Sequence, residues 1–99
     1  MLSHALVVKI IAKVDRAEEV ATFLADALPL AQSELFTPVW FALRANATTF
    51  YIVDAFGSAG DRQQHLDGSI AAALMAKASE LLAEPPAIEP VDVLASKIQ

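Results

Sequence analysis

The residues best suited to proton chemistry lie in one short stretch, DAFGSAGDRQQHLDGS at positions 54–69. Asp54 and Phe56 end a run that is typical of a β-strand, and His65 follows after a Gly/Ser hinge and a short polar segment. A histidine titrates near neutral pH, so His65 is a candidate general base or acid. The alternative is a structural histidine whose ring is hydrogen bonded to a nearby carbonyl or carboxylate.

Asp54 shares one face of its strand with Phe50, Ile52 and Phe56. A carboxylate among apolar neighbours must be paired, hydrated or shifted in pKa. Asp54 could therefore orient His65 or bind a substrate hydroxyl. The alternative is a structural hydrogen bond to the end of a helix.

Aromatic side chains on the two middle strands could form the wall of a pocket for an aromatic ligand. Phe50 and Phe56 lie on one strand, and Trp40 and Phe41 lie on the preceding one. The alternative is that most of these side chains belong to the hydrophobic core. Because Trp40 and Phe41 are consecutive, they face opposite sides of the sheet, and only one of them can line a cleft. Arg44 could anchor an acidic ligand or pair with an acid across a dimer, and the alternative is a solvated surface residue.

Several other site types are missing from the sequence. The chain has no cysteine, and its two histidines, His4 and His65, are too far apart in sequence for a metal-binding motif. It contains no glycine-rich phosphate loop, HExxH or GxSxG motif, so we predict neither a cofactor nor a metal.

The charge and hydropathy patterns limit the classes of partner that we expect. The net charge is −5 and the basic residues are scattered, so nucleic acid is not an expected partner. The apolar runs are much shorter than the roughly 20 residues that span a bilayer, and the N-terminus makes a poor signal peptide. We therefore expect a cytoplasmic protein that does not enter membranes.

The elements that must position these residues follow from hydrophobic periodicity. Asp15 is the expected N-cap of the first helix, Pro29 should kink that helix or end its first part, and Ser58 should cap the short helix. Pro90 requires an edge strand or a bulge. The predicted order is a strand over 5–14, a helix over 16–35, strands over 37–45 and 48–56, a short helix over 59–67, a helix over 69–83 and a strand over 87–98.

This β-α-β-β-α-β order predicts an α+β, ferredoxin-like fold: one antiparallel sheet with helices on one face, formed by residues 1–99 as a single domain. The composition is unusually apolar, with 56% hydrophobic and 19% charged residues. A core this small cannot hide that excess, and nothing in the chain remains to cover the second face of the sheet. We expect a second copy to cover it, which makes the protein a homodimer.

Three segments resemble the antibiotic biosynthesis monooxygenase family over nearly the whole chain: VDAF with the histidine that follows it, FLADALPLAQSEL with its internal proline, and LLAEPPAIEPVDVL. The resemblance implies a dimeric α+β barrel with a ligand cleft between sheet and helices in each subunit. Some members oxidise aromatic polyketides or quinols with O₂ and no cofactor, and others bind and degrade haem. The family commonly has tryptophan at the position of Phe56, and the haem-degrading branch has an asparagine on the first strand that ALVVKIIAKV lacks.

We therefore predict a cofactor-independent monooxygenase that oxidises a small aromatic or quinol-like substrate with O₂. The alternatives are a non-catalytic module that binds a small molecule in the same cleft, a haem protein with His65 as axial ligand, and an isomerase or lyase that uses a single base. The predicted site comprises catalytic His65 and Asp54, with Phe56, Trp40, Phe50 and Arg44 binding the substrate.

Overall fold

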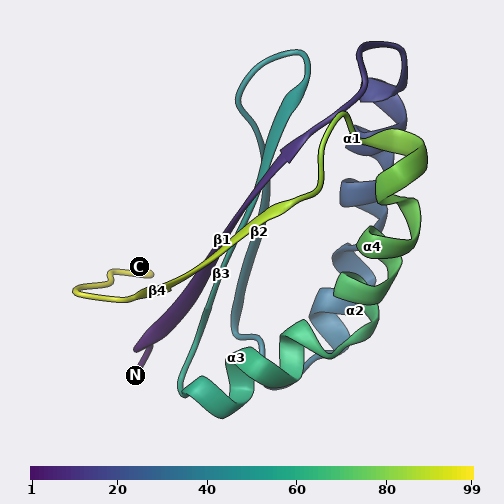
Figure 1. Cartoon of the computed structure of the whole chain (residues 1–99). Helices are drawn as coiled ribbons and strands as arrows, with labels where there is room; N and C mark the ends of the chain where they lie inside the picture. Colours follow the sequence, from purple (N-terminus) through teal and green to yellow (C-terminus); the bar gives the residue numbers. More distant parts are fainter.

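Runs of alternating apolar residues form one antiparallel sheet in the computed structural model, which describes residues 1–99. The order of the strands is β2-β3-β1-β4, and every neighbouring pair is antiparallel. This order confirms the predicted α+β, ferredoxin-like fold (Figure 1). The strands are β1 (His4–Ile11), β2 (Val39–Arg44), β3 (Thr49–Phe56) and β4 (Ala87–Asp92).

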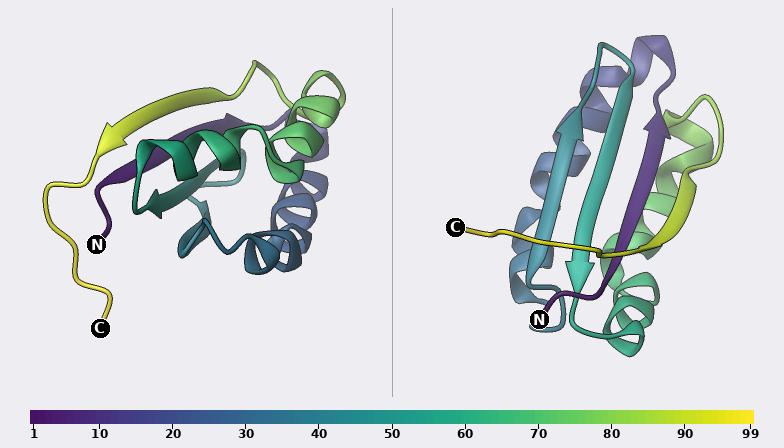
Figure 2. Two further views of the ribbon diagram at one scale, coloured as in Figure 1. Left: turned by 90° about the horizontal axis from the view of Figure 1, so that it is seen from below. Right: turned by 90° about the vertical axis from the view of Figure 1, so that its left-hand side faces the viewer.

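The helices lie together on one side of the sheet and leave its other face open (Figures 1 and 2). A 3-10 turn, η1 (Val14–Arg16), precedes the first of them. None of the helices combines the length and the apolar sequence that a membrane crossing requires. The helices are α1 (Ala17–Asp26), α2 (Leu28–Ser33), α3 (Ala59–Leu66) and α4 (Ser69–Leu81).

The two central strands direct every second residue towards the helices. On β3 these are Phe50, Ile52, Asp54 and Phe56, all of which are buried. Apolar residues of β1 lie opposite three of them, with Leu6 opposite Asp54, and His4 lies opposite Phe56. The main core cluster joins these strands to α1 and α4 through Val8, Ile10, Val20, Leu24, Phe50, Ile52, Leu74 and Leu81, among others.

Helix boundaries agree with some of the capping predictions and contradict one. Ser58 accepts a hydrogen bond from the backbone N–H of Asp61 at 3.0 Å, which confirms it as the N-cap of α3. Pro29 lies in the first turn of α2, and the predicted long helix is interrupted at Ala27. The prediction for Asp15 was wrong, because that residue lies inside the 3-10 turn η1 and α1 begins at Ala17 without a side-chain cap.

The last strand is shorter than the sequence pattern indicates. It ends at Asp92, whose partner His4 is the first residue of β1, and one further backbone hydrogen bond of 3.0 Å follows, from the N–H of Val93 to the carbonyl oxygen of Ser3. Figure 2 shows this C-terminal segment running away from the sheet. Pro90 lies on the edge strand β4, as predicted, where its missing N–H costs no bond within the sheet.

Candidate functional site

His65 lies on the last turn of α3 with its imidazole ring between two carboxylates. Its Nδ1 atom is 2.6 Å from Oε1 of Glu34, and its Nε2 atom is 2.9 Å from Oδ2 of Asp54. All three side chains are nearly or fully buried, with exposed fractions of 6% for His65, 8% for Glu34 and 0% for Asp54. A buried imidazole that faces two carboxylates is stabilised in its protonated form.

Burial and these carboxylates act in opposite directions on the pKa of His65. Burial lowers that pKa, whereas the contacts with Asp54 and Glu34 raise it, and the net pKa lies above the ordinary value of 6.5. An imidazolium can donate from both ring nitrogens, one to each carboxylate. With both carboxylates ionised, the three groups then carry a net charge of about −1.

Glu34 reaches His65 from the C-terminal end of α2. The hydroxyl of Thr37 donates a hydrogen bond of 2.8 Å to the same Oε1 atom and lies 3.4 Å from Nδ1 of His65. Gly68, between α3 and α4, allows this approach, because a Cβ there would lie 3.0 Å from Oε2 of Glu34 and 3.1 Å from the carbonyl oxygen of His65. The absence of a side chain at Gly68 therefore leaves the space that the carboxylate of Glu34 needs.

Asp54 is a fully buried acid whose oxygens retain hydrogen-bonding capacity. The contact from Nε2 of His65 is not aligned as a hydrogen bond, and neither oxygen accepts one from any other group. The indole N–H of Trp40, the direct cross-strand partner of Asp54 on β2, is also buried without an acceptor. These two neighbouring residues contain all the buried side-chain polar atoms that lack a partner, so hydrogen-bonding capacity is left unused here.

Asp54 and His65 line a small cavity between the sheet and the helices α3 and α4. Its volume is ≈ 30 Å³, enough for about one or two water molecules. Met75, which is half-exposed, forms part of its wall. The other lining residues are Leu6, Val8, Ile52, Leu66, Ile70, Ala71, Leu74 and Ile88, so the wall is otherwise apolar.

A second, more open cavity of ≈ 290 Å³ lies on the α2 side of the site. Thr37 and Trp40 are among its lining residues. Because Thr37 also contacts Glu34 and His65, it separates this outer cavity from the buried imidazole. The remaining lining residues are Leu28, Ala31, Gln32 and Pro38.

The structure brings some of the predicted site residues together. The ring of Phe56 lies 5.4 Å from the ring of His65, centre to centre, and Phe56 is fully buried beside it. Of the consecutive aromatic residues, Trp40 packs against the helices, whereas Phe41 is 55% exposed on the open face. Phe56, Trp40, Asp54 and His65 thus form one neighbourhood.

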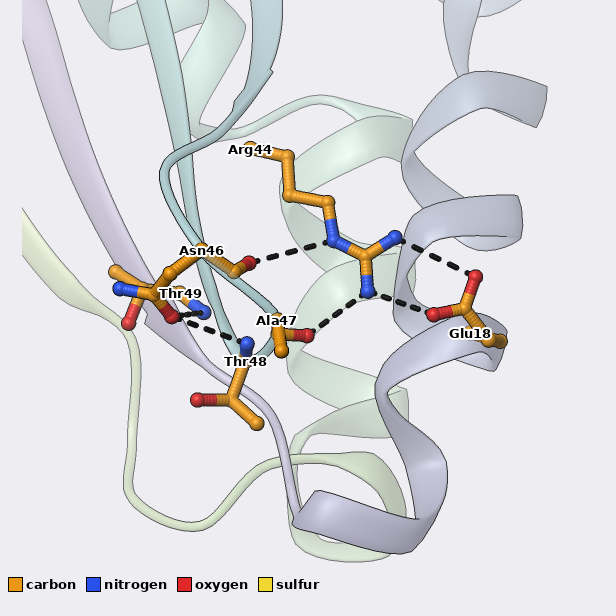
Figure 3. A network of polar contacts seen from close by, with 6 residues as sticks. All are labelled: Glu18, Arg44, Asn46, Ala47, Thr48 and Thr49. Atoms are coloured by element: carbon orange, nitrogen blue, oxygen red, sulfur yellow. Dashed lines mark hydrogen bonds and ion pairs between the residues drawn. The ribbon is translucent and has the colours of Figure 1, made fainter.

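Phe50 and Arg44 lie elsewhere, near the hairpin that joins β2 and β3. The Arg44 guanidinium lies 4.9 Å from the centre of the Phe50 ring and pairs with Glu18 of α1 at 2.6 Å. It also donates to the carbonyl oxygens of Asn46 and Ala47, so its hydrogen-bonding capacity is largely used within the chain (Figure 3). Its partners therefore stabilise the hairpin and hold it against α1.

No group of three or more His, Cys, Asp and Glu side chains is arranged to hold a metal ion. The residues also do not fit a haem. A haem iron needs a free nitrogen of His65, and both ring nitrogens already contact carboxylates. The cavity beside His65, at ≈ 30 Å³, is also far smaller than a porphyrin.

Glu34 and Thr37 were not among the predicted site residues. They lie 31 and 28 positions before His65, in the connection between α2 and β2. Their only signal in the sequence is their polarity in the short segment SELFTP, between an apolar helix and an apolar strand. Hydrophobic periodicity does not tell which helix ends meet in the folded chain.

Comparison with solved structures finds a protein of similar sequence and others that are similar in fold. The NE2512 protein of unknown function from Nitrosomonas europaea is 49% identical, with a TM-score of 0.97, over 100% of this chain and 96% of that chain. A proposed antibiotic biosynthesis monooxygenase from the same organism is 16% identical, with a TM-score of 0.81, over 93% of this chain and 90% of that chain. Another, from Caulobacter crescentus, is 18% identical, with a TM-score of 0.79, over 95% of this chain and 92% of that chain. No protein-family model and no curated protein matches the sequence.

Proposed function

Since this chain belongs to one family with the NE2512 protein and has the fold of the antibiotic biosynthesis monooxygenase-like proteins, we propose that it is a cofactor-independent monooxygenase acting on a small aromatic, quinol-like molecule. The observation that carries the proposal is the Asp54 carboxylate, buried beside His65 with oxygens that accept no hydrogen bond, on the wall of an apolar cavity. Such a wall suits an aromatic ring, and such a carboxylate suits a phenolic hydroxyl.

In this proposal Asp54 accepts the proton of the substrate hydroxyl, and His65 stabilises the charge. Both nitrogens of His65 face carboxylates, so the free lone pairs of the site belong to Asp54. When the proton moves to Asp54, the negative charge moves from Asp54 to the substrate oxygen. The net charge of the buried site is unchanged, so the transfer requires little reorganisation.

The deprotonated substrate then supplies the electrons. A hydroquinone anion is electron-rich enough to reduce O₂ directly. In the overall reaction, one oxygen atom enters the ring and the other leaves as water, so that hydroquinone plus O₂ gives hydroxyquinone plus water. Every electron that O₂ gains comes from the substrate, and this chain contributes the cavity, the base and the electrostatic environment.

The substrate must enter through a wall that can move. The cavity of ≈ 30 Å³ is too small for an aromatic ring as it stands. Met75 is 55% exposed at its rim, and Ile88, also on the rim, lies on the edge strand β4. A methionine side chain is flexible and adapts readily to a ligand. Displacement of Met75 would join the cavity to solvent between α4 and β4.

The open face of the sheet supports a homodimer. The residues that point away from the helices include the exposed side chains of Phe41 and Leu43, with Val7, Val53 and Tyr51 beside them. A large apolar sheet face of this kind is typical of an interface. A second copy packed face to face would cover it symmetrically.

Oxygen consumption tests the proposed reaction. Purified protein with a chelator present is mixed with a panel of hydroquinones and polyhydroxylated aromatic ketones, and O₂ uptake is recorded beside a protein-free blank. We expect uptake above the blank for at least one compound and its loss in His65→Ala, with circular dichroism to verify folding. Uptake that is equal in folded His65→Ala and in the wild type would overturn the proposal.

A second candidate function is binding of a small apolar molecule without turnover. The apolar, closed cavity and the full occupation of both His65 nitrogens favour it. A compound that raises the melting temperature and is recovered unchanged after incubation in air would support this function.

A further inference from the structure

We propose that the substrate carries an unbranched apolar chain, which binds in an open groove beside Met75 while the aromatic ring enters the small cavity at Asp54, here called the inner cavity. The inference rests on the proposed function and narrows its substrate class to phenols or hydroquinones with an alkyl substituent. The groove has a volume of ≈ 350 Å³ and lies along the C-terminal half of α4. Apart from Met75, its lining residues are Ala78, Ser79, Leu82, Ala83, Glu84 and Pro85.

Met75 is the one residue that lines both the inner cavity and the groove. Its side chain therefore lies between the buried Asp54 carboxylate and the groove. Met75 is 55% exposed, and an unbranched thioether side chain changes conformation readily to suit a ligand. A ligand that displaces Met75 towards solvent joins the two spaces into one binding site.

The two spaces follow a single face of α4. Ala71 lines the inner cavity, Ala78 and Leu82 line the groove, and Met75 lies between them in the sequence. Residues three and four positions apart share one face of a helix, so these four side chains form a continuous stripe. From Met75 to Leu82 the stripe is about 10 Å long, which accommodates an extended chain of about eight carbon atoms.

The chemistry of the groove favours an uncharged apolar chain. Its wall along α4 is formed by Met75, Ala78 and Leu82, and no lysine, arginine or histidine lines it. A phosphate or carboxylate on the chain would find no cation, and the carboxylate of Glu84 would repel it. Methylene groups bind there because they leave water.

The two volumes also complement each other. Ligand sites in proteins usually have volumes of about 300–1,000 Å³, a range that the inner cavity of ≈ 30 Å³ does not reach and the groove does. The inner cavity holds the base, and the groove provides contact area. A substrate with both a ring and a chain would use both.

Binding of 4-alkylphenols, which report on the groove without turnover, tests the proposal. Isothermal titration calorimetry measures the Kd of 4-methyl-, 4-butyl-, 4-octyl- and 4-decylphenol. Since the groove is open on one side, each methylene should tighten binding about twofold, half of the free energy of full burial. The octyl compound should then bind roughly 100-fold more tightly than the methyl compound. The gain should end at the octyl compound, because longer chains extend beyond the groove.

Ser79→Phe fills the groove one helical turn beyond Met75. Ser79 is exposed, so the variant should fold. We expect it to weaken binding of 4-octylphenol about tenfold or more and to leave 4-methylphenol unaffected. Ala76→Phe is the matched control, because Ala76 is exposed on α4 and lines neither space. If Ser79→Phe does not fold, Ala83→Phe blocks the far end of the groove and should weaken octylphenol binding while sparing butylphenol.

Equal affinities for methyl- and octylphenol would overturn the groove, as would octylphenol binding that Ser79→Phe and Ala76→Phe affect alike. Oxygen uptake with 2-methyl- and 2-octylhydroquinone separates this inference from the proposed function. Chain-dependent binding to a protein that oxidises neither compound would support the groove and leave the oxygenase proposal without support. Oxidation of both compounds with the same KM, together with binding that does not depend on the chain, would do the reverse.

Discussion

Oε1 of Glu34 lies 2.6 Å from Nδ1 of His65, although 31 positions separate the two residues. The contact joins the end of α2 to the end of α3 and encloses the imidazole between two acids. Taking these charges out of water is costly, so a purely structural core would be expected to avoid such a group unless its contacts compensate.

Glu34→Gln should lower the pKa of His65. The amide keeps the shape and an acceptor oxygen but removes the negative charge that helps hold the imidazole protonated. An NMR titration of the His65 ring protons measures the change. Glu84→Gln is the matched control, since Glu84 is exposed and makes no contact with His65. An unchanged titration midpoint in folded Glu34→Gln would show that this carboxylate does not set the protonation of His65.

The stability of the protein should fall as the pH rises above about 6.5, the ordinary pKa of an unfolded histidine. Because the folded pKa of His65 is raised, its contribution is fully present below the unfolded pKa and is lost as the pH passes through the folded pKa. Each pKa unit of difference corresponds to about 1.4 kcal/mol in the free energy of unfolding. Urea denaturation from slightly acid to alkaline pH measures how the free energy of unfolding changes with pH. In His65→Gln this fall in stability with rising pH should be absent. A wild type whose stability rises over this range would contradict the assignment.

Two glycine-to-alanine substitutions should have opposite effects on the stability of the folded chain. Gly68→Ala places a Cβ 3.0 Å from Oε2 of Glu34 and 3.1 Å from the His65 carbonyl oxygen, so it should destabilise the chain by about 1–3 kcal/mol and displace Glu34 from His65. Gly60→Ala, in α3, meets only Oγ of Ser58 at 3.8 Å and should stabilise by about 0.5–1 kcal/mol. Thermal and urea unfolding of both variants measures the change in stability that each substitution causes. Equal effects of the two substitutions would argue against a close approach of Glu34 at Gly68.

Phe41→Asp should convert the proposed dimer to a monomer. The side chain of Phe41 is 55% exposed on the open face of the sheet, and a charge there would be buried without a partner in a face-to-face dimer. Light scattering coupled to gel filtration gives the mass. Leu35→Asp is the control, because Leu35 is 95% exposed but lies outside the sheet. A wild-type chain that elutes at its monomer mass would contradict the proposed interface.

The order of elements was predictable because the strand segments are rich in β-branched and aromatic residues and the helical segments have apolar residues at three- and four-residue spacing. The alternation of β3 also placed Asp54 on the face of Phe50, Ile52 and Phe56, where the structure has it. Which of Trp40 and Phe41 faces the helices was not predictable, because both are aromatic and the pattern of β2 fits either register.

Local capping and long-range contacts were harder to predict. Asp15 has the right residue type for an N-cap, but the chain enters α1 through the turn η1, and Arg16 pairs with Glu19 instead. Glu34 and Thr37 join the site only because α2 is short and ends close to the junction of α3 and α4. Contacts of this kind depend on tertiary packing, which a single sequence does not encode in its local periodicity.

The most direct test of the central claim is the rate of O₂ uptake by Asp54→Asn with the compound that the wild type oxidises fastest. Asparagine keeps the size of the side chain but cannot accept the proton of a phenol. We predict a fall of about 100-fold or more in kcat, the usual contribution of a general base. Asp26→Asn, an exposed change on α1, should leave the rate unaltered. If folded Asp54→Asn consumes O₂ as fast as the wild type, Asp54 is not the proton acceptor and the account is wrong.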